Sequence, residues 1–244
     1  MTPRWLIVPA AGSGRRMGAE CPKQYLRIAE RPVLAYTLDR LHQAFPEAGL
    51  CLCLRPDDNH FTSDWVPFAD YRRVPGGEER VDSVINALRA IEPLARDDDL
   101  VLVHDVARPC VSIENLMELA HHAARQPNGA LLATPVADTI KRDDGAGCVQ
   151  RTEDRRGLWQ AQTPQGFRYA LLRRALEAAL SADGIGAAMV TDEASAVEAL
   201  GLTPVLVPGR RDNIKITHPE DLALATHILA AQRPSGPTQE TVAS

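Results

Sequence analysis

The segment Trp5-Leu-Ile-Val-Pro9, followed at once by Ala10-Ala-Gly-Ser-Gly14, places an apolar run directly before a loop of small residues. This pattern predicts a buried β-strand that enters a glycine loop. Similar apolar runs follow at residues 50–54, 71–74, 100–104 and 130–135, and helical periodicity lies between them at residues 33–45, 82–91 and 112–125. Strands that alternate with helices in this way indicate an α/β fold with a mainly parallel sheet covered on both faces.

The alternation stops between Val136 and Gln162, where polar residues surround the turn sequence Asp143-Asp-Gly-Ala-Gly147. Short β-like stretches at residues 139–142 and 148–152 flank this turn, so we predict a β-hairpin arm, about residues 136–157, that projects from the sheet. An isolated two-stranded arm is marginally stable in water. We therefore expect a partner surface to cover it, which favours a dimer.

The α/β pattern resumes after the arm. Helices are predicted at residues 169–180 and 192–200, the second with Thr191 as its N-cap and Gly201 as its stop. Short strands are predicted at residues 205–207 and 214–216, before a last helix whose Thr217 and Glu220 have capping-box spacing. Residues 233–244 form a polar tail that we expect to be disordered, which leaves a single domain of residues 1–232.

Composition excludes several classes of protein. The 244 residues are 45% hydrophobic and carry a formal net charge of −5, so the chain can fill a core and is not a general nucleic-acid binder. No apolar run approaches the roughly 20 residues of a membrane span, and the N-terminus lacks the features of a signal peptide, so we expect a cytoplasmic protein. The cysteines and histidines show none of the spacings typical of a protein metal site.

Lysine is rare in this chain. Of 27 basic residues only Lys23, Lys141 and Lys215 are lysines, which suggests positions that require a compact ammonium group. The loop after the first strand fits neither a dinucleotide fingerprint, because its third glycine comes one residue late, nor a P-loop. Its backbone N–H groups, with Arg15, Arg16 and Lys23, can hold phosphate oxygens. On the loop alone, a phosphate site and a tight turn with solvated arginines are both open.

Further motifs place this loop in a known context. They are Pro22-Lys-Gln-Tyr-Leu26, Gly76-Gly-Glu-Glu-Arg80, Val103-His-Asp-Val-Ala-Arg-Pro109, Pro135-Val-Ala-Asp-Thr-Ile-Lys141, Leu158-Trp-Gln-Ala-Gln-Thr-Pro-Gln165, Thr191-Asp-Glu-Ala194 and Asn213-Ile-Lys-Ile-Thr217. With the glycine loop, these ordered blocks resemble the nucleotidyltransferases, and within them the 2-C-methyl-D-erythritol 4-phosphate cytidylyltransferase family of the non-mevalonate isoprenoid pathway. The resemblance implies a Rossmann-like fold and a homodimer in which the arm is exchanged between subunits.

The resemblance also implies the reaction and its residues. CMP would pass from CTP to 2-C-methyl-D-erythritol 4-phosphate with release of pyrophosphate, and Mg²⁺ would be held mainly through the CTP phosphates. The implied catalytic residues are Arg16, Lys23, Arg155 and Lys215. The implied nucleotide-binding residues are Pro9, Ala10, Ala11, Gly12, Ser13, Gly14, Gly76, Gly77, Glu78, Arg80, Ser83 and Asp105. The implied acceptor-binding residues are Asp105, Arg108, Thr139, Arg155, Thr163, Thr191 and Lys215, of which Thr139 and Arg155 would come from the partner's arm.

Three other interpretations stay open at this point. A related cytidylyltransferase would use ribitol 5-phosphate, because an extra methyl group is worth only about 1–3 kcal/mol of discrimination. An NAD-dependent oxidoreductase shares the architecture, but the late glycine and the Arg15-Arg16 pair argue against it. A non-catalytic nucleotide-binding subunit is disfavoured by the joint presence of Arg16, Lys23, Arg155 and Lys215.

Overall fold

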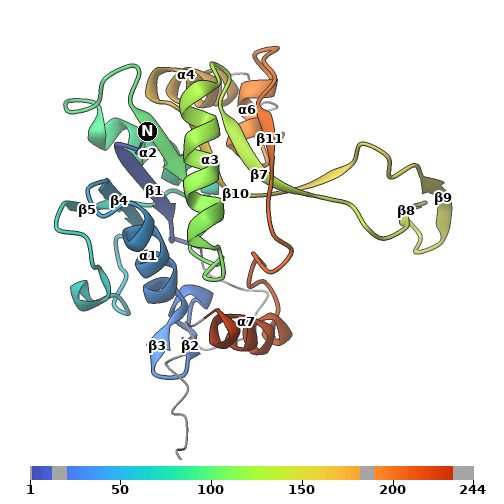
Figure 1. Ribbon diagram of the computed structural model, residues 1–244, viewed down its shortest axis with the longest axis horizontal. Coiled ribbons are helices and arrows are strands. Elements are labelled where there is room, and N and C mark those ends of the chain that lie inside the picture. Colours follow the sequence, from blue (N-terminus) through green and yellow to red (C-terminus); the bar gives the residue numbers. More distant parts are fainter. Residues whose placement is uncertain (1, 13–20, 182–189, 233–244) are drawn as a thin grey trace, which may run out of the picture.

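A seven-stranded sheet forms the centre of the computed structural model, which describes residues 2–12, 21–181 and 190–232 (Figure 1). Its strands are β1 (Trp5–Pro9), β4 (Gly49–Leu54), β5 (Tyr71–Pro75), β6 (Leu100–Val103), β7 (Ala130–Pro135), β10 (Trp159–Arg168) and β11 (Val205–Pro208). They lie in the order β11-β7-β10-β6-β1-β4-β5, and β10 runs antiparallel to both of its neighbours while the other pairs are parallel. The predicted α/β fold with a mainly parallel, Rossmann-like sheet is confirmed.

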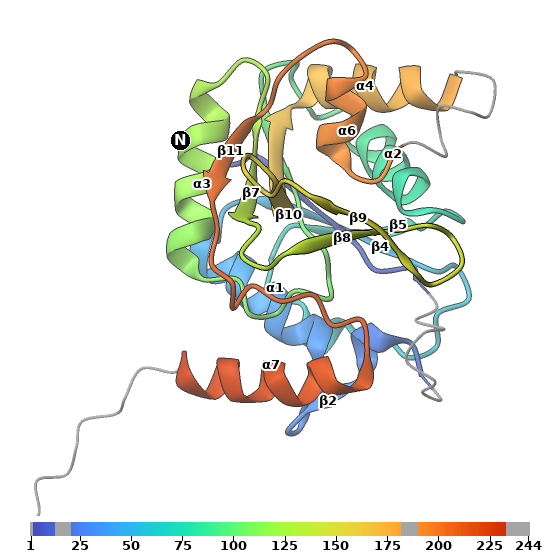
Figure 2. The same cartoon turned by 90° about the vertical axis from the view of Figure 1, so that its right-hand side faces the viewer.

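Helices cover both faces of this sheet. Helices α1 (Val33–Ala44) and α3 (Ile113–Arg125) lie on one face, and α2 (Arg80–Ile91), α4 (Tyr169–Ser181) and α6 (Glu193–Glu198) lie on the other (Figure 2). Successive residues of a strand point to opposite faces. In β1, Leu6 therefore packs under α1 and α3, whereas the neighbouring Ile7 packs under the other three helices.

A smaller layer closes the bottom of the molecule. Helix α7 (Pro219–Ala231) packs against the short strand β2 (Arg27–Ile28), which pairs with β3 (Arg31–Pro32), through a third apolar cluster (Figure 2). The described residues also form two single-turn helices, η2 (Lys23–Tyr25) and η3 (Ser63–Trp65). None of the described helices is long and apolar enough to span a membrane.

The predicted arm is present as a separate hairpin of β8 (Ile140–Asp143) and β9 (Val149–Glu153). The arm continues the antiparallel pair of β7 and β10. Where the arm begins, the Val136 N–H donates a hydrogen bond to the Leu158 oxygen at 3.0 Å. Figure 1 shows the arm reaching well beyond the sheet. Its side chains bond mainly to one another, as in the Lys141 Nζ to Thr152 Oγ1 bond of 2.7 Å, and Val149 is 64% exposed.

The strand β10 is the main element that the sequence analysis missed. Its first half is polar, and polar residues between apolar runs are typical of a loop. In the structure Gln162, Thr163 and Gln165 are nonetheless buried, because they bond to neighbouring segments at the strand end. The sheet register also shifts between Ala161 and Gln165, which hides any regular alternation.

Three local predictions were wrong. Residues 214–216 form no strand, because their backbone bonds a turn rather than a neighbouring strand, through the Ile216 N–H to the Ala107 oxygen at 2.8 Å. The N-cap of α6 is Asp192 rather than Thr191, since Asp192 Oδ1 accepts the Ser195 N–H at 2.9 Å. The last helix is capped one residue later than predicted, at His218, with Asp221 in place of Glu220 as its partner.

Candidate active site

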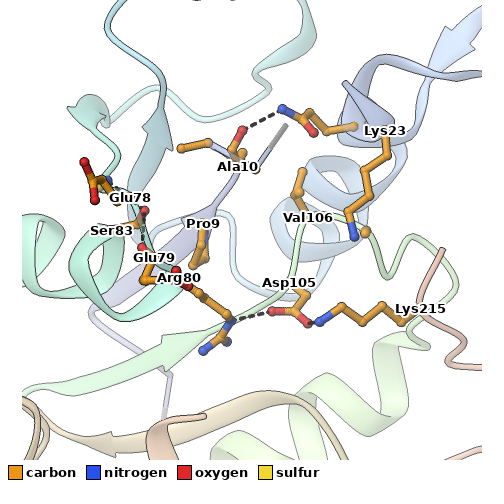
Figure 3. Close-up of a pocket in the computed structure, with 15 residues that line it drawn as sticks. Pro9, Ala10, Lys23, Glu78, Glu79, Arg80, Ser83, Asp105, Val106 and Lys215 are labelled. Atoms are coloured by element: carbon orange, nitrogen blue, oxygen red, sulfur yellow. Dashed lines mark hydrogen bonds and ion pairs between the residues drawn. The ribbon is translucent and has the colours of Figure 1, made fainter. Parts of the chain in front are cut away.

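The main pocket lies where the carboxyl ends of β1 and β6 meet (Figure 3). The strand order reverses here, because the chain continues from β1 to β4 on one side and returns to β6 on the other. Ligands of open α/β sheets bind at such a point. The lining residues are Pro9, Ala10, Ala11, Gly12, Lys23, Gln24, Gly77, Glu78, Glu79, Arg80, Ser83, Asp105, Val106, Ala107 and Lys215.

One wall of this pocket is built from closely packed backbone. A Cβ on Gly76 would lie 2.2 Å from the Cβ of Ala11, so only glycine permits the loop after β1 to approach the loop before α2. The Gly77 N–H donates to the Ser83 hydroxyl at 3.0 Å, and Gln24 Nε2 donates to the Ala10 oxygen at 2.7 Å. These contacts fix a narrow slot that can take a flat ring and read its edge through backbone groups.

A chain of ion pairs crosses the floor of the pocket (Figure 3). Asp105 accepts from Arg80 Nε at 2.9 Å with one oxygen and from Lys215 Nζ at 2.7 Å with the other. Burial alone would raise the pKa of Asp105, but the charges of Arg80 and Lys215 outweigh burial and hold this pKa well below its usual range. Asp105 is therefore an anion at any physiological pH.

A second pocket lies on the other side of this chain of ion pairs. It is lined by Arg80, Asp105, Arg108, Ala161, Gln162, Thr163, Gln165, Thr191, Asp192 and Lys215. Arg80, Asp105 and Lys215 line both pockets, so they form the boundary between them. Two ligands bound in these pockets would meet beside the cationic side chains of Arg80 and Lys215, which suits two anions that must approach each other.

Sequence reasoning missed Glu193, although it contacts this boundary directly. The side chain is 1% exposed, and its two carboxylate oxygens accept from Arg80 Nη1 at 2.5 Å and Nη2 at 3.0 Å. Burial raises the pKa of Glu193, and the charge of Arg80 opposes that rise. An acidic residue in the first turn of a helix usually serves the helix dipole, so position alone gave no signal of this contact.

Buried hydrogen bonds hold the backbone of Asp105 from behind. The Asp105 N–H donates to Thr163 Oγ1 at 3.0 Å, and Thr163 Oγ1 lies 3.0 Å from His104 Nδ1. His104 Nε2 is 3.2 Å from the Arg108 carbonyl oxygen, which can only accept, so Nδ1 must accept the Thr163 hydroxyl proton. The acceptor-binding role that the resemblance implies for Thr163 would require its hydroxyl to release His104 before it could donate to a ligand.

This arrangement makes the stability of the protein depend on pH. Burial lowers the pKa of His104 to about 4, below the roughly 6.5 of an unfolded chain, so the unfolded state binds more protons between these values. We expect the free energy of unfolding to fall as pH decreases from 6.5 towards 4, by up to about 3 kcal/mol from this residue. Urea denaturation across this range measures the effect.

The variant His104→Gln can make both hydrogen bonds without titrating, so its free energy of unfolding should depend less on pH than that of the wild type. His227→Gln, at an exposed position on α7, is the matched control and should keep the wild-type dependence. Parallel pH profiles for the wild type and His104→Gln would contradict this account.

The structure brings together most residues predicted for the site. The two pockets contain Pro9 to Gly12, Lys23, Gly77, Glu78, Arg80, Ser83, Asp105, Arg108, Thr163, Thr191 and Lys215, and Gly76 lies beneath Ala11. Thr139 and Arg155 are exposed on or beside the arm and line neither pocket of this chain. Ser13, Gly14 and Arg16 lie outside the described residues, as does the tail at 233–244.

The side chains of the site offer few ligands for a metal ion, so the site suits a metal ion that is bound mainly by the phosphates of a substrate. Within the described part of the chain, no three His, Cys, Asp or Glu side chains are grouped so that they could hold a metal ion. Both oxygens of Asp105 already accept from cations, and Glu78 and Glu79 are exposed carboxylates at the rim. A divalent ion here would take its ligands mainly from phosphate oxygens and water, which is common for Mg²⁺.

Comparisons with known proteins agree along nearly the whole chain. The family model described as IspD: 2-C-methyl-D-erythritol 4-phosphate cytidylyltransferase matches residues 5–231. Enzymes of that name from Chromohalobacter salexigens and Dechloromonas aromatica are 65% and 48% identical, over 94% and 96% of this chain and 91% and 100% of their own. The crystal structure of the Francisella tularensis enzyme of that name superposes with a TM-score of 0.80 at 33% identity, over 93% of this chain and all of the other.

Proposed function

Because the chain belongs to the 2-C-methyl-D-erythritol 4-phosphate cytidylyltransferase family, we propose that its two adjoining pockets hold the two substrates of that reaction. The enzyme is a nucleotidyltransferase that moves CMP from CTP to 2-C-methyl-D-erythritol 4-phosphate and releases pyrophosphate. The observation that supports our assignment is the shared boundary of Arg80, Asp105 and Lys215, which lies between the pockets.

The pocket at the end of β1 is the proposed CTP site. The cytosine would lie in the slot beside Gly77 and Ser83, where the Gly77 N–H already donates to the Ser83 hydroxyl and backbone carbonyl oxygens could accept from the cytosine amine. The triphosphate would lie along the glycine loop towards Lys23, whose Nζ lies 3.2 Å from the Ile216 oxygen. Arg16, Ser13 and Gly14 belong to the same proposed site through their place in the loop.

The proposed chemistry needs no general base. A phosphate monoester has a second pKa near 6 and is therefore largely a dianion at neutral pH. One of its oxygens attacks the α-phosphorus of CTP, a new P–O bond forms, and the bond to the β-phosphate oxygen breaks to release pyrophosphate. Lys23, Lys215 and Arg16 would neutralise the negative charge that builds on the α-phosphoryl group and the leaving pyrophosphate.

The second pocket is the proposed acceptor site. Asp105 would accept from hydroxyl groups of the acceptor, while Arg108 would supply positive charge and Thr191 a hydroxyl. Burial lowers the pKa of Arg108 from its usual value, and the carboxylate of Asp105, 3.9 Å away, opposes that change. Thr139 and Arg155 would complete the acceptor phosphate site from the arm of a second copy of the chain.

We also propose Mg²⁺ as a cofactor, held mainly by the phosphates of CTP. When bound, the ion would neutralise part of the triphosphate charge and orient its oxygens. The chain itself would contribute the cations on either side, Lys23 and Lys215, together with Arg16. Loss of turnover on chelation of divalent ions, with recovery on added Mg²⁺, is the matching measurement.

The remaining proposals concern the whole molecule. We propose one domain of residues 1–232, since both large apolar clusters pack on the same sheet. We propose that the enzyme acts in the cytoplasm, because all five cysteines lie in the described residues and are free thiols. The two cysteines of β4, Cys51 and Cys53, are fully buried inside the core.

Release of pyrophosphate from CTP and Mg²⁺ tests the function directly. We expect release with 2-C-methyl-D-erythritol 4-phosphate and none without an acceptor. Release with ribitol 5-phosphate alone would keep the site assignment and change the acceptor. Release with neither alditol phosphate would overturn the assignment of the two pockets.

Deletion of the arm tests the proposed dimer. Replacing residues 137–157 by a short glycine turn would join Val136 to Leu158, whose backbones already bond at the base of the arm. We expect the variant to be monomeric by light scattering and to lose at least about 100-fold in kcat/KM, because the acceptor site would lack two ligands. The variant should still unfold in one cooperative transition, since the arm bonds mainly to itself within the chain. A fully active dimer would refute the exchange.

A further inference from the structure

Glu193 reaches the boundary between the pockets from a helix whose position is fixed independently. Gln165, in the buried end of β10, accepts the Ala194 N–H with its Oε1 at 2.9 Å and donates from Nε2 to Asp192 Oδ2 at 2.8 Å. These two bonds hold the residues on either side of Glu193. The backbone at Glu193 is therefore fixed, and the fold positions its carboxylate next to Arg80.

The guanidinium of Arg80 is fixed between two carboxylates. Its Nε faces Asp105 at 2.9 Å, while Nη1 and Nη2 form a parallel pair of bonds with Glu193. Such a fork-to-fork contact sets the plane of the guanidinium as well as its position. In this orientation Arg80 gives Asp105 a single bond, which leaves the second oxygen of Asp105 to Lys215 at 2.7 Å.

Removal of the Glu193 charge would change how the two oxygens of Asp105 are shared between Arg80 and Lys215. The paired N–H groups of Arg80 would be released, and Asp105 is the nearest remaining carboxylate that could accept both. A bidentate contact between Arg80 and Asp105 would take the oxygen that now accepts from Lys215. Asp105 would then turn away from the second pocket, and Lys215 would lose the partner that fixes its ammonium group.

We propose that Glu193 is a positioning residue that holds Arg80 by a buried two-bond contact and, through Arg80, fixes Asp105 and Lys215 at the boundary of the two pockets. The proposal rests on the assignment of those pockets to CTP and an alditol phosphate. Because the two residues before Glu193, Thr191 and Asp192, line the second pocket, the loss of Glu193 should affect the acceptor more than CTP.

The test compares Glu193→Gln, which keeps the shape and removes the charge, with Glu198→Gln, an exposed position on the same helix. For Glu193→Gln we expect the KM for the acceptor to rise at least about tenfold, because a displaced contact near the reacting groups has effects of this size. The Kd of CTP, measured by calorimetry, should stay within about threefold of the wild type, and Glu198→Gln should match the wild type in both. The proposal would be overturned by an unchanged acceptor KM, or by a fold-change in the Kd of CTP larger than the fold-change in the acceptor KM.

A double-mutant cycle distinguishes an effect through Arg80 from an independent one. We expect Glu193→Gln to add little in a chain that already carries Arg80→Met, and additive losses would refute the route through Arg80. If Glu193→Gln fails to fold, Glu193→Asp replaces it, since the shorter carboxylate can reach Arg80 with only one bond. That variant should raise the acceptor KM at least about threefold, and a wild-type KM would count against the proposal.

The wild-type assay keeps this proposal separate from the proposed function. If the wild type transfers CMP to neither alditol phosphate, the assignment of the pockets fails. If the wild type is active and the Glu193 variants bind and turn over the acceptor normally, the positioning role alone fails.

Discussion

Lys215→Ala should lower kcat by about 100- to 1,000-fold, an effect typical of a lost group that stabilises charge in the transition state. The ammonium of Lys215 lies 2.7 Å from Asp105 and lines both pockets, so it is placed beside the proposed path of the attacking oxygen. CTP should still bind, because the slot beside Gly77 and the cation of Lys23 remain. Steady-state kinetics with a separate measurement of the Kd of CTP would show this difference.

Lys215→Arg should recover little of the lost kcat. The chain contains only three lysines among 27 basic residues, and an arginine at this position would present a planar fork to Asp105 instead of a compact charge. Arg174→Ala, which removes an exposed cation on α4, should retain the wild-type kcat. Turnover near the wild-type rate in Lys215→Ala would remove Lys215 from the catalytic group.

A mixture of two inactive variants should regain about a quarter of the wild-type activity if the arm acts in the partner's site. Lys215→Ala disables the site on its own subunit, whereas Arg155→Ala disables the site that its arm enters. In a mixed dimer one site carries both defects and the other carries neither. Because random exchange makes about half of the dimers mixed, about one site in four becomes functional.

The activity should appear only after the two variants have been unfolded and refolded together, or expressed together. A mixture of Lys215→Ala with Lys23→Ala is the matched control, since each change disables the site of the subunit that carries it. In that pair every site keeps at least one defect, so the mixture should stay inactive. Equal recovery in both mixtures would argue against an arm that crosses between subunits.

The central strands and the place of the main pocket could be predicted from sequence because each depends on local signals. Apolar runs such as Leu100 to Val103 mark buried parallel strands, and ligands gather at the carboxyl ends of such strands. Asp105 comes directly after one of these runs, so its position beside the pockets could be predicted from the sequence. The glycine at position 76 could be placed in the site only through the resemblance of its sequence block, and its close packing against Ala11 became visible in the structure.

The parts that escaped prediction depend on contacts between distant residues. The strand β10 has no apolar alternation at its polar end, because its buried glutamines bond to segments that follow it by some 30 to 50 residues. Asp192 lay inside the helix predicted at residues 192–200, yet it caps α6 and accepts from Gln165. Glu193 and His104 owe their roles to partners on other elements, Arg80 and Thr163, which no spacing along the chain could indicate.

The antiparallel strand at the centre of the sheet also has a consequence for the synthesis of the protein. Domains begin to fold from the N-terminus as the chain leaves the ribosome. Until β10 emerges, β6 has one unpaired edge, and β7 has neither of its partners, because β10 and β11 both follow it along the chain. Open strand edges pair readily with other chains. A nascent or truncated chain that stops within the arm would therefore be prone to aggregate, and these edges are closed only once residues 159–168 and then residues 205–208 have been made.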